Sequence, residues 1–195
     1  MFRPSSERGD GRPISRSRLL LAVSIWLASP APVFAEAGGC QLIPDDRNPS
    51  EKMLRCGDNL TIRSAADTRY RLTDQNDQDL QKGELPKEGP PNGARLDSGA
   101  LMIEFKPTEG RRNFQIRTPH AIAAVRGTTW AVEVEAEKTS TLVILGFVEV
   151  RRPDANSGAL LRAGQGSDVS PGTGPVTVKR WAKKRVDALL ARFGQ

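Results

Sequence analysis

The fold is decided by a strand signal at residues 128–137, which read TTWAVEVEAE. Side chains two positions apart along a strand point to the same face, and here one face carries Thr128, Trp130, Val132, Val134 and Ala136. The opposite face carries Thr129, Ala131, Glu133, Glu135 and Glu137. The pattern predicts a strand with one face in a hydrophobic core and the other face in water.

Short strands of the same kind surround this one. Residues 139–150 repeat the pattern, with an apolar run at 142–145 that predicts burial on both faces and Gly146 at a bend. Turn residues between other short segments predict three strand pairs: 60–62 with 70–72, 100–105 with 113–117, and 159–163 with 167–170. Such spacing favours a mainly β fold, a compact β roll or sandwich of short antiparallel strands, over a βαβ fold.

The chain ends in a different pattern, which predicts an amphipathic α-helix of about four turns from residue 178, ended by Gly194. Its apolar face carries Ala182, Val186, Leu189, Leu190 and Phe193, with Trp181 beside them. Its polar face is basic and carries Lys179, Arg180, Lys183, Lys184, Arg185 and Arg192 against one acid, Asp187. Packing on the chain's own sheet is the favoured interpretation. The alternative is contact with anionic lipid or an acidic partner.

The first 35 residues have the features of an export signal. Arginines at 12, 16 and 18 precede a ten-residue apolar stretch, and small residues at 33 and 35 favour cleavage after Ala35. An uncleaved signal anchor is the alternative. We therefore expect a mature chain of residues 36–195, periplasmic or secreted. No apolar run of about 20 residues is present, which excludes a multi-pass membrane protein.

The charge balance does not indicate nucleic-acid binding. The whole chain has 29 basic and 23 acidic side chains. Removing the five arginines and two acids of residues 1–35 leaves 24 and 21, a formal balance of +3. This balance is mild, and an exported protein rarely meets nucleic acid, so we expect no nucleic-acid partner.

Cysteine and histidine usage argues against catalysis and metal binding. Cys40 and Cys56 are separated by fifteen residues, and outside the reducing cytosol they are expected to form a disulfide. A metal or redox site would need a CxxC pair or several histidines, and His120 is the single histidine. No nucleophile paired with a base and no cofactor loop is recognisable. The sequence therefore predicts a protein that is not an enzyme and holds no cofactor or metal.

A series of short motifs lies between residues 114 and 170. The motif residues are Thr118, Pro119, Arg126, Gly127, Thr128, Trp130, Gly146, Val148, Gly164 and Gly166. In this order the series resembles the FecR-type periplasmic domain, a family named for the ferric citrate regulator of bacterial iron uptake. The resemblance implies a compact, mainly β periplasmic module that takes part in transenvelope signalling or protein contact, without catalysis. The resemblance implies that a complete regulator of the family has three parts in order: a cytoplasmic anti-sigma segment, one membrane span and the periplasmic domain. Here the leader stands in place of the first two parts, so the chain resembles a free-standing member whose partner is a membrane sensor or another envelope protein.

Physical roles follow for the motif residues. Gly127 is expected to allow a turn or a close approach that a Cβ would forbid, and Gly146, Gly164 and Gly166 are expected to form bends. Arg126 either pairs with an acid of its own strands or presents its planar guanidinium to a carboxylate of a partner or ligand.

The sequence divides into five predicted segments: a signal peptide at 1–35, a disulfide-tied N-terminal extension with a first hairpin at 36–72, a polar loop at 73–98, a FecR-type β domain at 99–175 and a basic helix at 176–195. Two functions remain open. The preferred one is a non-catalytic periplasmic module for envelope signalling through protein–protein contact. The alternative is a structural or ligand-binding envelope protein that contacts cell-wall glycan or an anionic membrane surface.

Overall fold

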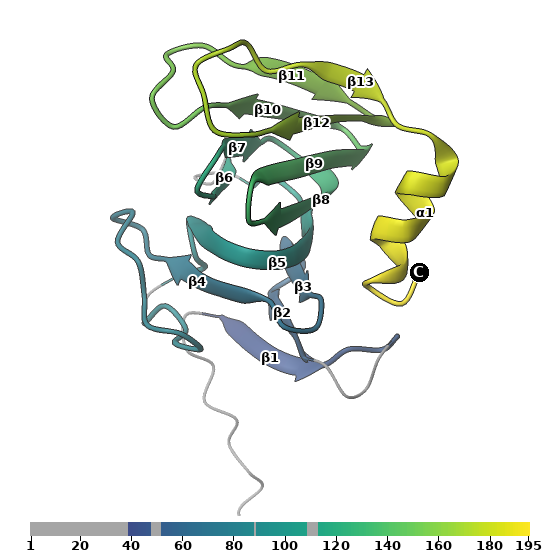
Figure 1. Cartoon of the computed structure of the whole chain (residues 1–195). Coiled ribbons are helices and arrows are strands. Elements are labelled where there is room, and N and C mark those ends of the chain that lie inside the picture. The colour runs from purple at the N-terminus through teal and green to yellow at the C-terminus, as the bar shows by residue number, and fades with distance from the viewer. Residues whose placement is uncertain (1–38, 48–51, 88, 109–112) are drawn as a thin grey trace, which may run out of the picture. The chain divides into compact units, whose positions relative to one another are not determined.

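The computed structural model describes residues 39–47, 52–87, 89–108 and 113–195 (Figure 1). The predicted signal peptide and its cleavage site after Ala35 lie outside the described residues. The described part holds thirteen strands and one helix: β1 (Cys40–Pro44), β2 (Lys52–Cys56), β3 (Leu60–Ser64), β4 (Arg69–Thr73), β5 (Gly93–Phe105), β6 (Phe114–Arg117), β7 (Ile122–Val125), β8 (Thr128–Glu135), β9 (Lys138–Leu145), β10 (Phe147–Arg151), β11 (Ala159–Arg162), β12 (Gln165–Val169), β13 (Val178–Arg180) and α1 (Lys183–Ala191). The predicted fold class, mainly β with a C-terminal helix, is confirmed.

The 13-residue strand β5 organises the fold because two sheets share it. Its first half pairs with β4 antiparallel and with β6 parallel, and its second half pairs antiparallel with β3 and β8. The halves meet near Gly99, where φ is +90° and a Cβ would lie 2.6 Å from the Cα of Thr68. Only glycine fits this close contact, which lets one strand continue from one sheet into the other.

The two sheets enclose one hydrophobic core in a barrel-like arrangement (Figure 1). Sheet A runs β1-β2-β3-β5-β8-β9-β12-β13, and sheet B runs β4-β5-β6-β7-β10-β11. Trp130 of β8 and Phe114 of β6 are the largest fully buried side chains in this part of the chain. They come from different sheets, so the core depends on both sheets being formed.

Helix α1 covers the outer face of sheet A and forms a second, smaller core (Figure 1). On β8, Trp130 and Val132 point into the main core, whereas Ala131 lies in the cluster under α1 and is completely buried. The expectation that the second face of β8 lies in water is therefore wrong for its central part. The run at 142–145 is expected to be buried on both faces. Leu142 is buried against α1 and Val143 is buried in the main core, as expected, but Leu145 is 66% exposed.

The three predicted strand pairs are not formed. Strands β3 and β4 pair with different halves of β5 and not with each other. Strands β5 and β6 are parallel instead of forming a hairpin, because β6 joins the opposite end of β5. Strand β11 pairs with β10, and β12 pairs with β9 and β13. A turn signal marks a local change of direction but does not specify which of the two sheets the next strand enters.

Three predicted boundaries also differ from the structure. The stretch 93–98, assigned to the polar loop, is the first half of β5, with Ala94 and Leu96 buried between polar neighbours. The helix is nine residues long, and residues 178–180 form β13 instead. Lys179 and Arg180 therefore lie on a strand, because the edge of β12 offers hydrogen-bond partners that an isolated helical turn lacks. The helix ends at Ala191 with Arg192 as its C-cap, so the predicted C-cap position of Gly194 is wrong. Gly194 lies in the turn that follows, where its φ is +69° and the Gln195 N–H donates to the Leu190 carbonyl at 3.3 Å.

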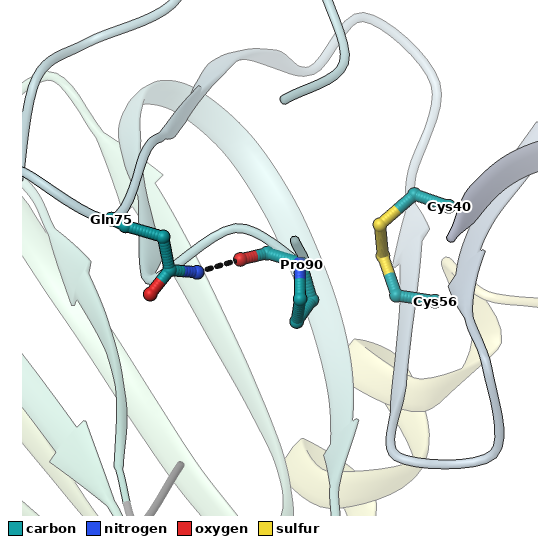
Figure 2. The surroundings of a disulfide bond; sticks show 4 residues. All are labelled: Cys40, Cys56, Gln75 and Pro90. Atoms are coloured by element: carbon teal, nitrogen blue, oxygen red, sulfur yellow. Dashed lines mark hydrogen bonds between the residues drawn. A yellow bond between two sulfur atoms is a disulfide. The ribbon is translucent and has the colours of Figure 1, made fainter. Parts of the chain in front are cut away.

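The disulfide between Cys40 and Cys56 is confirmed (Figure 2). These residues face each other across the β1–β2 hairpin and are buried. In the neighbouring 74–92 segment, the Gln75 amide donates a hydrogen bond to the Pro90 carbonyl (Figure 2).

Candidate functional site

The central part of the predicted motif lies where the chain crosses between the sheets at two adjacent points. The first crossing leads from β7 of sheet B to β8 of sheet A through Arg126 and Gly127, and the second leads from β9 back to β10 through Gly146. Gly127 has φ +69° and Gly146 has φ +88°. A Cβ at position 146 would lie 2.5 Å from the Gly127 carbonyl oxygen. The two crossings therefore lie against each other, and the contact requires glycine at 146.

Thr128 joins the two crossings by hydrogen bonds. Its hydroxyl donates to the Phe147 carbonyl at 2.8 Å and accepts from the Phe147 N–H at 3.4 Å. Trp130 and Val148, the next motif residues on each side, are completely buried in the main core. In this region the predicted motif residues, except Arg126, hold the two crossings together or fill the core.

Thr118 organises the turn between β6 and β7. Its hydroxyl donates to the Ala121 carbonyl at 2.9 Å and accepts from the Ala121 N–H at 2.9 Å. It also lies 2.8 Å from the Thr139 hydroxyl at the start of β9, which ties the turn to sheet A. Pro119 and His120 line a surface groove of about 470 Å³ beside this turn. His120 Nδ1 lies 3.3 Å from the Thr139 hydroxyl, so the structure gives this histidine a hydrogen-bonding role in the turn.

Gly164 and Gly166 position the start of the C-terminal segment. The Gly164 N–H donates to the Val143 carbonyl at 2.9 Å, and its carbonyl accepts from the Trp181 N–H at 3.3 Å. A Cβ at position 166 would lie 2.6 Å from the Thr141 carbonyl oxygen and would overlap the indole of Trp181. The bare backbone of Gly166 is therefore the surface on which Trp181 rests.

Ion pairs hold α1 on sheet A. Arg185 donates to both carboxylate oxygens of Asp168, at 2.8 Å to Oδ2, and its guanidinium lies 3.5 Å from the centre of the Trp181 ring. The hydrogen bond from Arg185 lowers the pKa of the Asp168 carboxyl below its ordinary value of 3.8 and outweighs the opposite effect of burial. Arg192 donates through Nη1 to one carboxylate oxygen of Glu133 on β8. These contacts agree with the favoured interpretation of the helix, packing on its own sheet.

The other predicted basic residues remain at the surface. Lys183 pairs with Asp187 inside the helix, and its side chain is 88% exposed. Lys184 on α1 and Lys179 and Arg180 on β13 are exposed. The structure thus separates the predicted basic group into Arg185 and Arg192, which are bound to sheet A, and four cations that face solvent.

Arg126 has a different environment from the rest of the motif. It is exposed and has no hydrogen-bond or ion-pair partner among the described residues. It lines a surface groove of about 420 Å³ together with Phe147, Glu149 and Leu160. Phe147 and Leu160 are absent from the sequence prediction. A signal was available for Phe147, because alternation along β10 places it with Glu149, opposite the buried Val148.

Within the described ranges, no group of three or more histidine, cysteine or acidic side chains lies close enough to hold a metal ion. The same ranges contain no helix with the length and apolar character needed to cross a membrane.

Comparison with known proteins identifies similar chains. A family model described as FecR protein matches residues 47–149. Two crystal structures, at 1.65 and 2.50 Å resolution, of a protein described as a putative anti-sigma factor from Parabacteroides distasonis ATCC 8503 have a similar fold, each with TM-score 0.50 and 19% identity. The similarity covers 79% of this chain and 61% of that one. No curated protein sequence matches the chain.

The family match also bears on the predicted division of the chain. It begins at residue 47 and so includes much of the segments predicted as an N-terminal extension and a polar loop. Strand β5 crosses the predicted boundary between residues 98 and 99, because both of its halves are needed to join the sheets.

Proposed function

The chain belongs to the FecR protein family, and from this premise we propose that it is a non-catalytic periplasmic module that takes part in envelope signalling through contact with another protein. The partner class that we propose is a membrane sensor or another envelope protein. The observation that carries the proposal is the family match over residues 47–149, in which the motif residues build two sheet crossings and no catalytic constellation.

The periplasmic location is part of the proposal. It is supported by the disulfide between Cys40 and Cys56, which is favoured by an oxidising compartment. It is also supported by the leader pattern at residues 1–35.

The test is crosslinking in living bacteria that express the full chain, followed by identification of the captured proteins. We expect a recurrent envelope protein whose capture persists when the chain is present at its natural level. A chain that captures no envelope protein, or that is found only in the cytoplasm, contradicts the proposal.

The alternative function has one supporting observation, the solvent-facing cations Lys179, Arg180, Lys183 and Lys184 at the C-terminal end. The full chain would then sediment with anionic vesicles or cell-wall sacculi at low salt, where electrostatic screening is weakest. Binding that is lost on replacing Lys183 and Lys184 by glutamate would favour this alternative. Failure to sediment at low salt would remove it.

A further inference from the structure

We infer that the outer face of β7, β10 and β11 binds an acidic segment of a partner protein that carries an apolar side chain next to its carboxylates. The face, called the Arg126 face below, consists of Ala124, Arg126, Phe147, Glu149, Leu160 and Arg162. The inference rests on the proposed function, since it names the surface and the chemistry of the protein contact.

Strand register places these residues in two adjacent rows. In the first row, Glu149 of β10 lies opposite Ala124 of β7 on one side and opposite Leu160 of β11 on the other. In the second row, Phe147 lies opposite Arg162, and Arg126 continues the β7–β10 register on the other side. The Arg162 guanidinium thus lies over the Phe147 ring, and Arg126, the residue after β7, lines the same groove as that ring.

The Arg126 face exposes apolar surface that the rest of the described chain mostly buries. Phe147 is 48% exposed and Leu160 is 54% exposed. They are two of the four large hydrophobic side chains that are exposed in this part of the chain, the others being Leu42 and Leu145. Clustered apolar exposure beside polar groups is typical of a protein contact surface, because covering it removes apolar area from water.

The charges on the Arg126 face specify the partner's chemistry. Several arginines of the described chain form ion pairs with carboxylates of the same chain, as Arg95 does with Asp79 and Arg117 does with Asp77. Arg126 has no such partner among the described residues, and the guanidinium of Arg162 lies over the Phe147 ring at 5.2 Å. The planar guanidinium of arginine binds a carboxylate through two parallel hydrogen bonds. It can do so while its face stays stacked on an aromatic ring. Arg126 has no carboxylate partner among the described residues, and in the same part of the chain Arg162 contacts the exposed ring and forms no ion pair. Both guanidinium groups can therefore bind carboxylates of an acidic segment.

Glu149 limits which acidic segments fit. It lies between the apolar members of the first row and forms no ion pair with any described residue. A carboxylate of the partner is repelled there and attracted at the row of Arg126 and Arg162. The expected segment therefore places its acids over the second row and its apolar side chain over Leu160.

The test is selection of a random peptide library displayed on phage against the immobilised full chain at low salt. We expect selected peptides to be enriched in Asp or Glu next to an aromatic or branched aliphatic residue. Their affinity should fall at least about tenfold for Arg126→Glu, whereas Lys184→Glu, the same charge change on the exposed helix surface, should leave it within about twofold.

Four results would overturn the inference. Selected peptides could lack acidic residues or fail to emerge, or they could bind the Arg126→Glu and Lys184→Glu chains equally. Self-association of the full chain that Phe147→Asp abolishes would assign the Arg126 face to a second copy instead.

The crosslinking experiment separates this inference from the proposed function. If Arg126→Glu still captures the same envelope protein as the native chain, the proposed function stands and the inference about the Arg126 face fails. If neither chain captures an envelope protein, the proposed function fails, whatever the peptides show.

Discussion

The hydroxyl of Thr128 donates a hydrogen bond of 2.8 Å to the carbonyl oxygen of Phe147. The two residues are the first of β8 and the first of β10, and each follows a glycine with positive φ. One side chain thus fixes the spacing of two of the places where the chain passes between the sheets, from β7 to β8 and from β9 to β10. The same geometry leaves the Phe147 ring on the outer surface beside Arg126.

Replacing Thr128 by valine keeps the shape of the side chain and removes its hydroxyl. The Phe147 N–H and carbonyl then lose their partner at a buried position, and we expect the free energy of unfolding to fall by about 1–3 kcal/mol. Urea unfolding measures the change. Thr129→Val is the matched control on the other face of β8 and should stay within about 0.5 kcal/mol of the native chain. Equal effects of the two substitutions would contradict the proposed role of the hydroxyl.

Gly146→Ala should be more destabilising than Gly57→Ala. Both positions have positive φ, but an added Cβ at 57 meets no atom within 4 Å, whereas at 146 it meets the Gly127 carbonyl oxygen at 2.5 Å. The backbone conformation alone costs about 1–2 kcal/mol at either site. The clash at 146 should add roughly 1–3 kcal/mol. Thermal and urea unfolding of the two variants test this order, and equal stabilities would show that the crossings relax apart without cost.

Loss of the disulfide should destabilise the chain by roughly 3 kcal/mol, the value of the chain-entropy model for a loop of about 15 residues. The measurement compares the melting temperature of the oxidised chain with and without reductant, and with that of the Cys40→Ala, Cys56→Ala double variant. The double variant should melt at a temperature that reductant does not change. Two titratable thiols in the oxidised, denatured protein would contradict the bond.

Acid should weaken the contact between α1 and sheet A. The Arg185 hydrogen bond lowers the pKa of the Asp168 carboxyl in the folded chain. The carboxyl therefore binds a proton less tightly in the folded state than in the unfolded state. The stabilisation is therefore complete above the unfolded pKa of about 3.9 and is lost as pH falls through the lower folded value. The stability difference between the native chain and Asp168→Asn should be constant from pH 7 to about pH 4 and shrink below it.

The control for this experiment is Asp154→Asn, an exposed position in the loop after β10. The difference in free energy of unfolding between the native chain and Asp154→Asn should not decrease as the pH falls. If the difference between the native chain and Asp168→Asn increases as the pH falls, the predicted sign of the effect is wrong.

Arg126→Ala should leave stability unchanged within about 0.5 kcal/mol, because the side chain is exposed and unpaired among the described residues. This prediction separates Arg126 from its neighbours Gly127 and Thr128, which hold the crossing together. Urea unfolding measures it. A loss comparable to that of Thr128→Val would show that Arg126 belongs to the architecture and would weaken its use as a contact residue.

Local chemistry made several features predictable. The disulfide follows from two cysteines in a chain with an export pattern. The positive φ of Gly127, Gly146 and Gly164 agrees with the expected bends. Each of these depends on a residue type and its immediate neighbours.

Pairing partners were not predictable in the same way. Strands β3, β4 and β6 all pair with β5, so that β3 does not pair with β4 and β6 lies parallel to β5 instead of forming a hairpin with it. One strand shared by two sheets makes these choices, and its first half was hidden because charged residues alternate with Ala94 and Leu96. The same limitation applies to Ala131, whose burial depends on a helix more than 50 residues away along the chain.

By itself, the sequence determined the fold class, the disulfide, the places where the backbone bends and the family resemblance, because side-chain alternation, cysteine chemistry and glycine conformations are local properties. Only the tertiary structure decided that Thr128 meets Phe147, that Asp168 holds Arg185 and that Arg126 remains unpaired beside an exposed ring. These relationships join residues that are far apart along the chain. They depend on which sheet each strand enters, a choice made by burial of the shared core.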